Sequence, residues 1–224
     1  MRTHLANSSA ASLVLAIAVS APVPTARAAP GRCPKRAIPP LLRSDFEKAT
    51  DVSLRRSGQR VAVVCYSPTR SGSVCRQLDT SLAEQLTRRL TRHSITAVEP
   101  KQIGAWLEGH PEWNTPSEIG TGVGARFIIR IDIEQFIRKN DSKSDGQTVT
   151  FRATVRMVEV HSLEYGSCIY SNSFTWNRSL TAQEKSASNE EIIRSCCEPI
   201  TERIGRLFYA HLPVLTAAGT VARK

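Results

Sequence analysis

The amino-acid sequence predicts an α/β (α+β) fold, in which a single mixed β-sheet is packed with helices in the order β-α-β-α-α-β-β-β-α. Two observations favour this fold. Strand and helix patterns alternate through the first half of residues 59–213, and three strand patterns follow one another in the second half. These residues, about 155 in number, are enough for one domain with a real core. One sheet covered by helices is the simplest architecture for that order.

The first elements are a strand and a long helix. Residues 60–66 (RVAVVCY) form a nearly continuous apolar run, which is typical of a strand covered on both faces. The helix is predicted over 74–92, where one apolar side chain recurs every four residues. These side chains form a single stripe: Val74, Leu78, Leu82, Leu86 and Leu90. Residues 95–98 then predict a second short strand, and Pro100 opens a helix that stops near Gly109.

A glycine-rich stretch follows the third predicted helix. Residues 115–118 (TPSE) have the composition of a helix start, and Gly120, Gly122 and Gly124 predict that the helix is short. The same glycines look like part of a phosphate-binding loop. A dinucleotide loop, however, follows a strand and opens a helix, whereas these glycines follow a helix and precede a strand. The context therefore argues against nucleotide binding.

Three strands and a helix complete the predicted domain. Residues 126–137, 149–160 and 166–176 alternate between apolar and polar side chains, as half-buried strands do. In the first of them one face is apolar (Phe127, Ile129, Ile131, Ile133) and the other is charged (Arg130, Asp132, Glu134). In the second, the apolar face holds Val149, Phe151, Ala153, Val155 and Met157, opposite Arg152 and Arg156. A final helix over 189–212 is expected to kink or restart at Pro199.

Residues 1–28 have the organisation of a cleavable secretory signal. A short basic start with Arg2 precedes an apolar run at 10–21, which is well below the roughly 20 residues that span a bilayer. Residues 26–28 (ARA) offer the small-x-small pattern of signal peptidase, so cleavage is predicted before Ala29. An uncleaved anchor or a buried core helix is the alternative. Export predicts a location in the periplasm or outside the cell.

The regions flanking the domain read as linker and tail. Residues 29–58 are predicted to be a proline-rich basic linker, with a helical turn near 45–49, and residues 214–224 to be a flexible tail. A lipid anchor is not expected, because Arg32 precedes Cys33 where a lipoprotein signal has a small residue. No second apolar run of membrane length follows the signal, so the mature chain is expected to lack a transmembrane segment.

Net charge narrows the class of partner. The chain has 30 basic and 20 acidic residues, a net charge of +10, and removal of Arg2 and Arg27 with the signal lowers it to +8. Such a charge suits lipid head groups, acidic glycans or acidic proteins. The alternative is that the charge serves solubility alone. Nucleic acid is not an expected partner of an exported protein.

No convincing catalytic, metal or cofactor site is predicted. The six cysteines, which permit one or two disulfides with open pairing, are Cys33, Cys65, Cys75, Cys168, Cys196 and Cys197. None lies in a CxxC or another metal-type spacing. Four histidines are scattered without a nearby motif partner: His93, His110, His161 and His211. Asp132 and Glu134 form a carboxylate pair, for which Arg152 and Arg156 on the neighbouring strand are the expected ion-pair partners.

The most unusual local feature is an aromatic cluster at a helix end. Trp106, His110 and Trp113 crowd residues 106–113. Aromatic side chains at such a break anchor partner proteins in many interfaces, which makes these three the predicted partner-binding residues. The alternative is that they cap the core beneath a loop.

Together these segments resemble a group of uncharacterised secreted proteins and lipoproteins of planctomycete-type bacteria. The resemblance lies in RVAVVCYSP (60–68), AWLEGHPEWNTPSEIG (105–120), ARFIIRIDI (125–133) and IGRLFY (204–209). More distantly, the layout is similar to the amino-terminal α/β module of the Tol translocation protein. It is also similar to the lipoproteins of curli secretion and of penicillin-binding-protein activation. The resemblance implies a non-catalytic envelope module that binds other proteins, and it transfers no functional residues.

The function expected from the sequence is therefore an exported, non-enzymatic cell-envelope protein that acts as a protein-binding or assembly module. Two alternatives remain. One is a structural envelope protein that binds an anionic polymer, which the basic charge favours. The other is a cell-wall hydrolase, which would need polar groups converging in a cleft.

Overall fold

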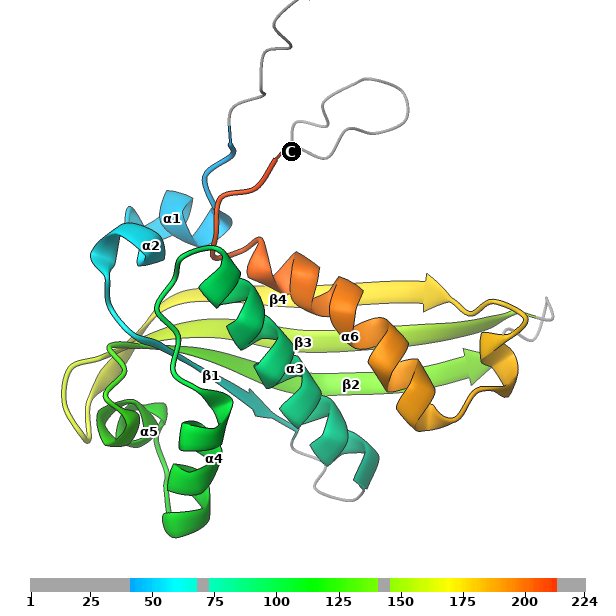
Figure 1. Cartoon of the computed structure of the whole chain (residues 1–224), viewed down its shortest axis with the longest axis horizontal. Coiled ribbons are helices and arrows are strands. Elements are labelled where there is room, and N and C mark those ends of the chain that lie inside the picture. Colours follow the sequence, from blue (N-terminus) through cyan, green and yellow to red (C-terminus); the bar gives the residue numbers. More distant parts are fainter. Residues whose placement is uncertain (1–40, 68–72, 141–145, 213–224) are drawn as a thin grey trace, which may run out of the picture. The chain divides into compact units, whose positions relative to one another are not determined.

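A four-stranded sheet carries the fold, and its strands lie side by side in the order β1-β2-β3-β4 (Figure 1). β1 (Val61–Tyr66) runs parallel to β2 (Phe127–Asn140), whereas β2, β3 (Gln147–Val160) and β4 (Gly166–Ser179) form an antiparallel meander. A parallel pair needs a long crossover, and the helices between β1 and β2 supply it. The prediction of a single mixed sheet packed with helices is confirmed.

The computed structural model describes three stretches of the chain: residues 41–67, 73–140 and 146–212. All of them belong to one compact unit, which begins at Pro39. The predicted signal peptide (1–28), the first part of the predicted linker and the predicted tail (214–224) lie outside the described residues.

Two helices cover one face of the sheet. α3 (Ser73–Arg92) and α6 (Asn189–Gly205) lie across that face and contact each other (Figure 1). The predicted apolar stripe is confirmed for the members whose side chains are described, which are buried in the main core: Leu78, Leu82, Leu86 and Leu90. The side chain of Val74 lies outside the described part. The apolar faces predicted for β2 and β3 also point into this core.

The opposite face is covered at one end only. α4 (Pro100–Gly109) and α5 (Pro116–Val123) pack there on the other set of alternate strand residues. The result is a second, smaller core: Ala62, Val64, Val98, Ile103, Ile119, Val123, Ala125, Ile128, Val158 and Val160. Because side chains alternate along a strand, β1 is buried on both faces, as its continuous apolar run predicted.

The second strand predicted at residues 95–98 is wrong. Ala97 makes only an isolated parallel bridge to Val61, and the N–H of Val98 donates to the Val61 carbonyl oxygen at 2.8 Å. Pro100 begins α4 directly afterwards, so no length remains for a ladder. The sheet therefore has four strands within the described residues, instead of the five that were expected.

Two short helices precede β1 inside the segment predicted as a linker (29–58). They are α1 (Asp45–Thr50) and α2 (Leu54–Ser57). Phe46 and Leu54 are buried in the main core, so this part of the segment belongs to the folded unit. Helices of this length have little stability of their own, and burial against distant residues stabilises them instead.

α5 is short, as predicted, although two of its glycines lie inside it, and α6 ends before the expected residue. α5 continues through Gly120 and Gly122 to Val123, although glycine disfavours helix. α6 continues through Pro199 without restarting and ends at Gly205 instead of reaching residue 212. The chain then turns, which buries the two aromatic residues that follow. Among the described residues, no helix is both long and apolar enough to span a bilayer.

Candidate functional site

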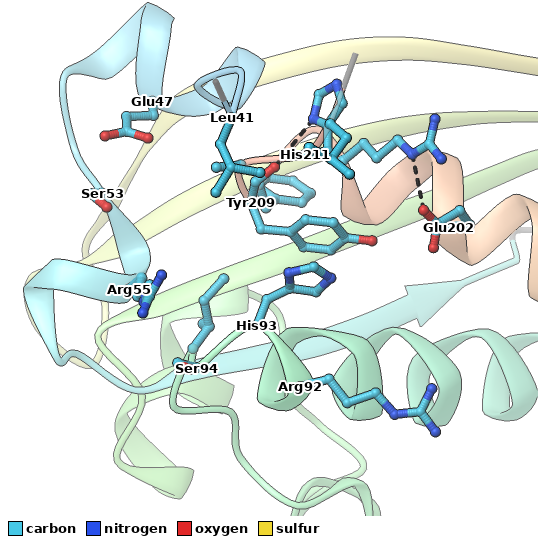
Figure 2. A pocket seen from close by; sticks show the side chains of 15 residues that line it. Leu41, Glu47, Ser53, Arg55, Arg92, His93, Ser94, Glu202, Tyr209 and His211 are labelled. Atoms are coloured by element: carbon cyan, nitrogen blue, oxygen red, sulfur yellow. Dashed lines mark hydrogen bonds and ion pairs between the residues drawn. The ribbon is translucent and has the colours of Figure 1, made fainter. Parts of the chain in front are cut away.

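A groove of about 620 Å³ lies where the two ends of the described chain meet (Figure 2). Its walls come from α1 and α2, the end of α3, and residues 202–212, and we refer to it as the terminal groove. Leu42 and His211 join its walls by an antiparallel bridge, in which each N–H donates to the other residue's carbonyl oxygen, at 2.9 and 3.2 Å. The volume is within the roughly 300–1,000 Å³ range of ligand pockets.

Apolar side chains line part of the terminal groove. Leu41 and Leu212 stand at its rim, where they are 59% and 53% exposed. Ile95 and Phe208 line it from the core side and are buried. Exposed apolar groups are thus continuous with the interior at this end of the molecule.

Two stacked rings form one wall of the terminal groove. The rings of His93 and Tyr209 lie nearly parallel, with centroids 3.6 Å apart (Figure 2). Tyr209 also packs on the backbone of Gly205, where a Cβ atom would lie 2.6 Å from the ring. The phenol oxygen of Tyr209 is buried, and this burial is the main cause that raises the pKa of Tyr209.

Both carboxylates that line the terminal groove are neutralised by arginines. Glu202 pairs with Arg89 and accepts a hydrogen bond from the Nε of Arg206 at 2.9 Å. Burial alone would raise the pKa of Glu202, but the Arg206 hydrogen bond and the charges of Arg89 and Arg206 outweigh it and lower the pKa. Glu47 lies 2.5 Å from Arg56 and 3.7 Å from Arg43.

Two arginines of the terminal groove form no ion pair with the described side chains. Arg55 and Arg92 line it, are exposed, and have no carboxylate within ion-pair distance among the residues with described side chains. Their positive charge is therefore not balanced locally. Burial is the main cause that lowers the pKa of His93, and the nearby charges of Arg89 and Arg55 lower it further against the opposing effect of Glu202. The terminal groove is both apolar and basic.

Arg92 also belongs to two neighbouring grooves. One, of about 550 Å³, lies between α3 and α6, and the other, of about 400 Å³, lies between α3 and the start of α4. Both contain Arg88 and Glu84, which form an ion pair of 2.9 Å. The basic character thus extends from the terminal groove along the end of α3.

The predicted partner-binding residues lie at the end of α4. The rings of Trp106 and His110 stack with centroids 4.4 Å apart, and the Nδ1 of His110 lies 2.8 Å from the Trp106 carbonyl oxygen. Trp106 and Trp113 are half-buried and pack against the second core, while His110 is exposed. A Cβ atom at Gly122 would lie 1.9 Å from the Trp106 indole nitrogen, so this glycine makes room for the ring. Partner binding by these residues stays a prediction.

The described cysteines form no disulfide with one another. Four cysteines are free. Cys65, Cys196 and Cys197 lie in or against the main core, and Cys168 is exposed. Burial raises the pKa of Cys65 and Cys196, and it raises that of Cys197 to about 12. These three thiols are therefore poor nucleophiles near neutral pH. The side chains of Cys33 and Cys75 lie outside the described part.

The predicted carboxylate pair has a structural role. Asp132 accepts a hydrogen bond from Arg130 at 2.7 Å and lies 3.1 Å from Arg156, which confirms one of the expected cross-strand ion pairs, whereas Arg152 pairs with neither carboxylate among the described side chains. Glu134 accepts a hydrogen bond from the Thr154 hydroxyl at 2.6 Å. Among the described side chains, no group of three or more His, Cys, Asp or Glu residues is placed to hold a metal ion.

The uncovered part of the second sheet face is polar apart from the half-buried Ile137, and we refer to it as the polar sheet face. Its side chains come from three strands: Gln135 and Lys139 of β2, Thr148, Thr150, Arg152 and Thr154 of β3, and Ser171, Ser173, Thr175 and Asn177 of β4. A groove of about 470 Å³ lies on it between Lys139 and Arg152.

Sequence reasoning did not identify the terminal groove. Its residues come from the segment predicted as a linker, from one helix end, and from the last residues of the described chain. The only local signal was the presence of apolar residues, such as Leu41 and Phe208, in segments that were expected to be polar or helical. Their meeting depends on the Leu42–His211 bridge, which no local pattern encodes.

Comparison with known proteins shows distant similarity in structure only. No family model matches the sequence, and no curated protein matches it. The hypothetical protein CT253 from Chlamydia trachomatis is 16% identical, with a TM-score of 0.42 over 66% of this chain and 95% of that one. Lipoprotein GNA1162 from Neisseria meningitidis is 12% identical, with a TM-score of 0.43 over 65% and 97% of the two chains.

A third solved structure, the PelC dodecamer from Paraburkholderia phytofirmans, is 11% identical, with a TM-score of 0.37 over 70% of this chain and 91% of that one. Hypothetical and lipoprotein structures are thus among those that this chain is similar to. Likenesses at this level of identity and overlap do not indicate a shared function.

Proposed function

We propose that this chain is an exported cell-envelope protein that acts by binding another protein, as an assembly module, and not by catalysis. One observation carries the proposal. Leu41 and Leu212 are exposed and line the same groove, because the bridge between Leu42 and His211 brings their two segments together. Exposed apolar side chains that gather on a folded surface are typical of protein-binding sites.

The state of the reactive groups supports a non-enzymatic role. Glu202 and Asp132 are each held between two arginines, and three of the four described thiols have a raised pKa. A general base or nucleophile needs a pKa near the working pH and access to its substrate. These carboxylates are engaged in ion pairs and these thiols are buried, which makes them poor candidates for a base or a nucleophile.

Photo-crosslinking tests the proposed function directly. A photo-reactive amino acid is placed at one of three exposed positions in the natural host: Leu212 beside the terminal groove, His110 at the end of α4, or Thr175 on the polar sheet face. The proposal expects a covalent adduct with one specific protein from at least one position, identified by mass spectrometry. Absence of any specific adduct from all three positions would contradict it.

Export has its own test. The chain recovered from the periplasmic fraction or the culture medium is expected to begin at Ala29, as intact-mass analysis will show. Replacing Ala28 with a large residue blocks signal peptidase and should give a longer, retained form. Recovery of the wild-type chain from the cytoplasm with residues 1–28 attached would rule out export.

The polar sheet face supports a second candidate function, which is binding of an anionic polymer. Hydroxyl and amide groups repeat across three strands there, and Lys139 and Arg152 add positive charge. Co-sedimentation with polygalacturonate should then fall as salt is added, because exposed charge contacts are screened. The double variant Lys139→Glu/Arg152→Glu should abolish it, and unchanged binding by that variant would dismiss this candidate.

A further inference from the structure

We propose that the terminal groove is the binding site for an acidic, partly apolar segment of a partner protein. This inference rests on the proposed function and specifies its partner chemistry. It follows from three observations. Two concern the described residues, namely which charges of the terminal groove are compensated and where its apolar side chains lie; the third is the charge that the sequence gives the chain's own end segments.

The charge pattern selects an acidic partner. The two carboxylates of the terminal groove are already neutralised, Glu202 by Arg89 and Arg206 and Glu47 mainly by Arg56. The exposed guanidinium groups of Arg55 and Arg92 have no carboxylate at ion-pair distance in the described part of the chain. A partner carboxylate placed at either of them would gain charge-assisted hydrogen bonds without displacing an existing pair.

The apolar side chains select a segment that also carries hydrophobic groups. Leu41 and Leu212 rise from the rim, and Ile95 and Phe208 continue the apolar surface inward. Burial of the two exposed leucines under a partner would remove apolar area from water, which favours association. A purely acidic segment would leave this area uncovered, so the preferred segment combines leucine-like and acidic residues.

The charge of the chain's own end segments argues against self-occupancy. Residues 29–40 carry Arg32, Lys35 and Arg36 and no acidic residue, and residues 213–224 end in arginine and lysine and have no acidic residue either. Both segments would meet the free arginines of the terminal groove with like charge, which is unfavourable. The complementary occupant therefore comes from another molecule.

Selection from a displayed library of random dodecapeptides tests the inference while the partner is still unidentified. The immobilised mature chain is expected to enrich peptides in which Asp or Glu alternates with Leu, Ile or Phe. Enrichment of basic or purely apolar peptides, or no enrichment, would overturn the inference. The enriched peptide, labelled with fluorescein, then serves as the probe in anisotropy titrations.

Charge reversal locates the binding site. Arg55→Glu/Arg92→Glu should weaken binding of the labelled peptide by about tenfold or more, because reversed charges repel the carboxylates. The matched control Lys101→Glu/Arg203→Glu changes the net charge equally at two exposed positions outside the terminal groove and should bind within about twofold of wild type. If both double variants weaken peptide binding equally, the net charge of the protein explains the loss, and the inference is overturned.

The apolar contribution has a matched pair of variants as well. Leu41→Ser/Leu212→Ser should weaken binding about tenfold, while Leu163→Ser/Tyr165→Ser, which removes exposed apolar groups from the β3–β4 turn, should leave it unchanged. All four residues are exposed, so both variants are expected to fold.

Binding to vesicles of phosphatidylglycerol and phosphatidylcholine is measured as a separate test for a lipid ligand. Binding to these vesicles that competes with the peptide and depends on the same leucines would assign the surface to lipid and refute a protein segment.

The crosslinking experiment separates the two proposals. A specific adduct from His110 or Thr175 but not from Leu212 would leave the protein-binding function standing and would remove the terminal groove as its site. Absence of specific adducts from all three positions would remove the proposed function itself.

Discussion

The two faces of the sheet are built from the same strands but are covered very differently. On one face, alternate residues of β1, β2 and β3 meet α3 and α6 in the main core. On the other face, α4 and α5 cover only the end near β1, and the remainder is the polar sheet face. β2, β3 and β4 each have 14 residues, whereas α4 has 10 and α5 has 8.

This difference predicts which face of the sheet stabilises the fold and which face is available to bind a ligand. The face under α3 and α6 has its apolar residues committed to packing, so substitutions there should act on folding. The polar sheet face has little to lose on substitution and is free to meet a ligand. The terminal groove lies at the end of α3, where the helical cover stops and apolar groups reach the surface.

The largest expected effect is a difference in the free energy of unfolding between a substitution in the main core and one on the polar sheet face. Phe151→Ala removes a fully buried ring from the main core and should lower the free energy of unfolding by about 3–5 kcal/mol. Thr175→Ala on the polar sheet face should change it by less than about 0.5 kcal/mol. Urea denaturation of both variants measures the contrast. Similar destabilisation by the two would abolish the distinction between the faces.

The covered end of the second face should respond to overpacking. Gly122→Ala places a methyl group against the Trp106 indole and should destabilise the fold by about 1–3 kcal/mol, with a shift of tryptophan fluorescence. Gly104→Ala in α4 is the control, because no atom lies within 4 Å of the position that its methyl group would take. Alanine favours helix, so this control should gain up to about 1 kcal/mol. Equal stability of the two variants would show that the second core is loosely packed.

The edge of the polar sheet face should show an intermediate effect. Asp132 is held between Arg130 and Arg156, and its side chain is only 16% exposed. Asp132→Asn should therefore destabilise the fold by about 1–2 kcal/mol, since it removes a hydrogen-bonded charge. Glu134→Gln, two residues further along the same strand and exposed, should stay within about 0.5 kcal/mol. Thermal unfolding of both variants is the measurement. If Asp132→Asn leaves stability unchanged, this ion pair does not stabilise the fold, and the part of the sheet face that tolerates substitution reaches β1.

The smallest expected effect is a pH dependence from the terminal groove. The pKa of His93 in the folded chain is lowered, mainly by burial, below its usual value of 6.5. Below pH 6.5 the unfolded chain therefore binds more protons than the folded chain, and stability falls as the pH falls. Urea denaturation at pH 7.5 and 5.5 should show this loss in wild type and a smaller loss in His93→Gln. An identical loss in both would contradict the assignment to His93.

Patterns with a short period predicted most of the sheet. The alternation in residues 149–157 assigned the five β3 residues of the main core to the correct face, because a pleated strand forces successive side chains to opposite sides, whereas Val158 and Val160 of the second core were not assigned. The four-residue spacing of leucines likewise identified the buried side of α3. Asp132 and Arg156 were expected to pair for the same reason, since their strands are neighbours.

The missed features all depend on residues that are distant in sequence. Phe46 stabilises α1 through ring contacts with Tyr170 and Phe208, at centroid distances of 5.7 and 5.9 Å. α5 extends past its glycines because Gly122 admits Trp106 and Gly120 admits β2 and β3. No local propensity contains these contacts, so propensity predicted only a helical turn near 45–49 within a linker, and placed the glycines after the short helix instead of inside it.

The sequence alone determined which side of each strand and long helix is apolar and therefore buried. It follows from this pattern that helices pack against one mixed sheet. Only the tertiary structure decided how far α4 and α5 reach along the second face, and that Leu42 meets His211 to close the terminal groove. The physical reason is the range of the interactions. Side-chain periodicity is a property of a few consecutive residues, whereas the terminal groove exists only where segments from both ends of the folded chain pack together.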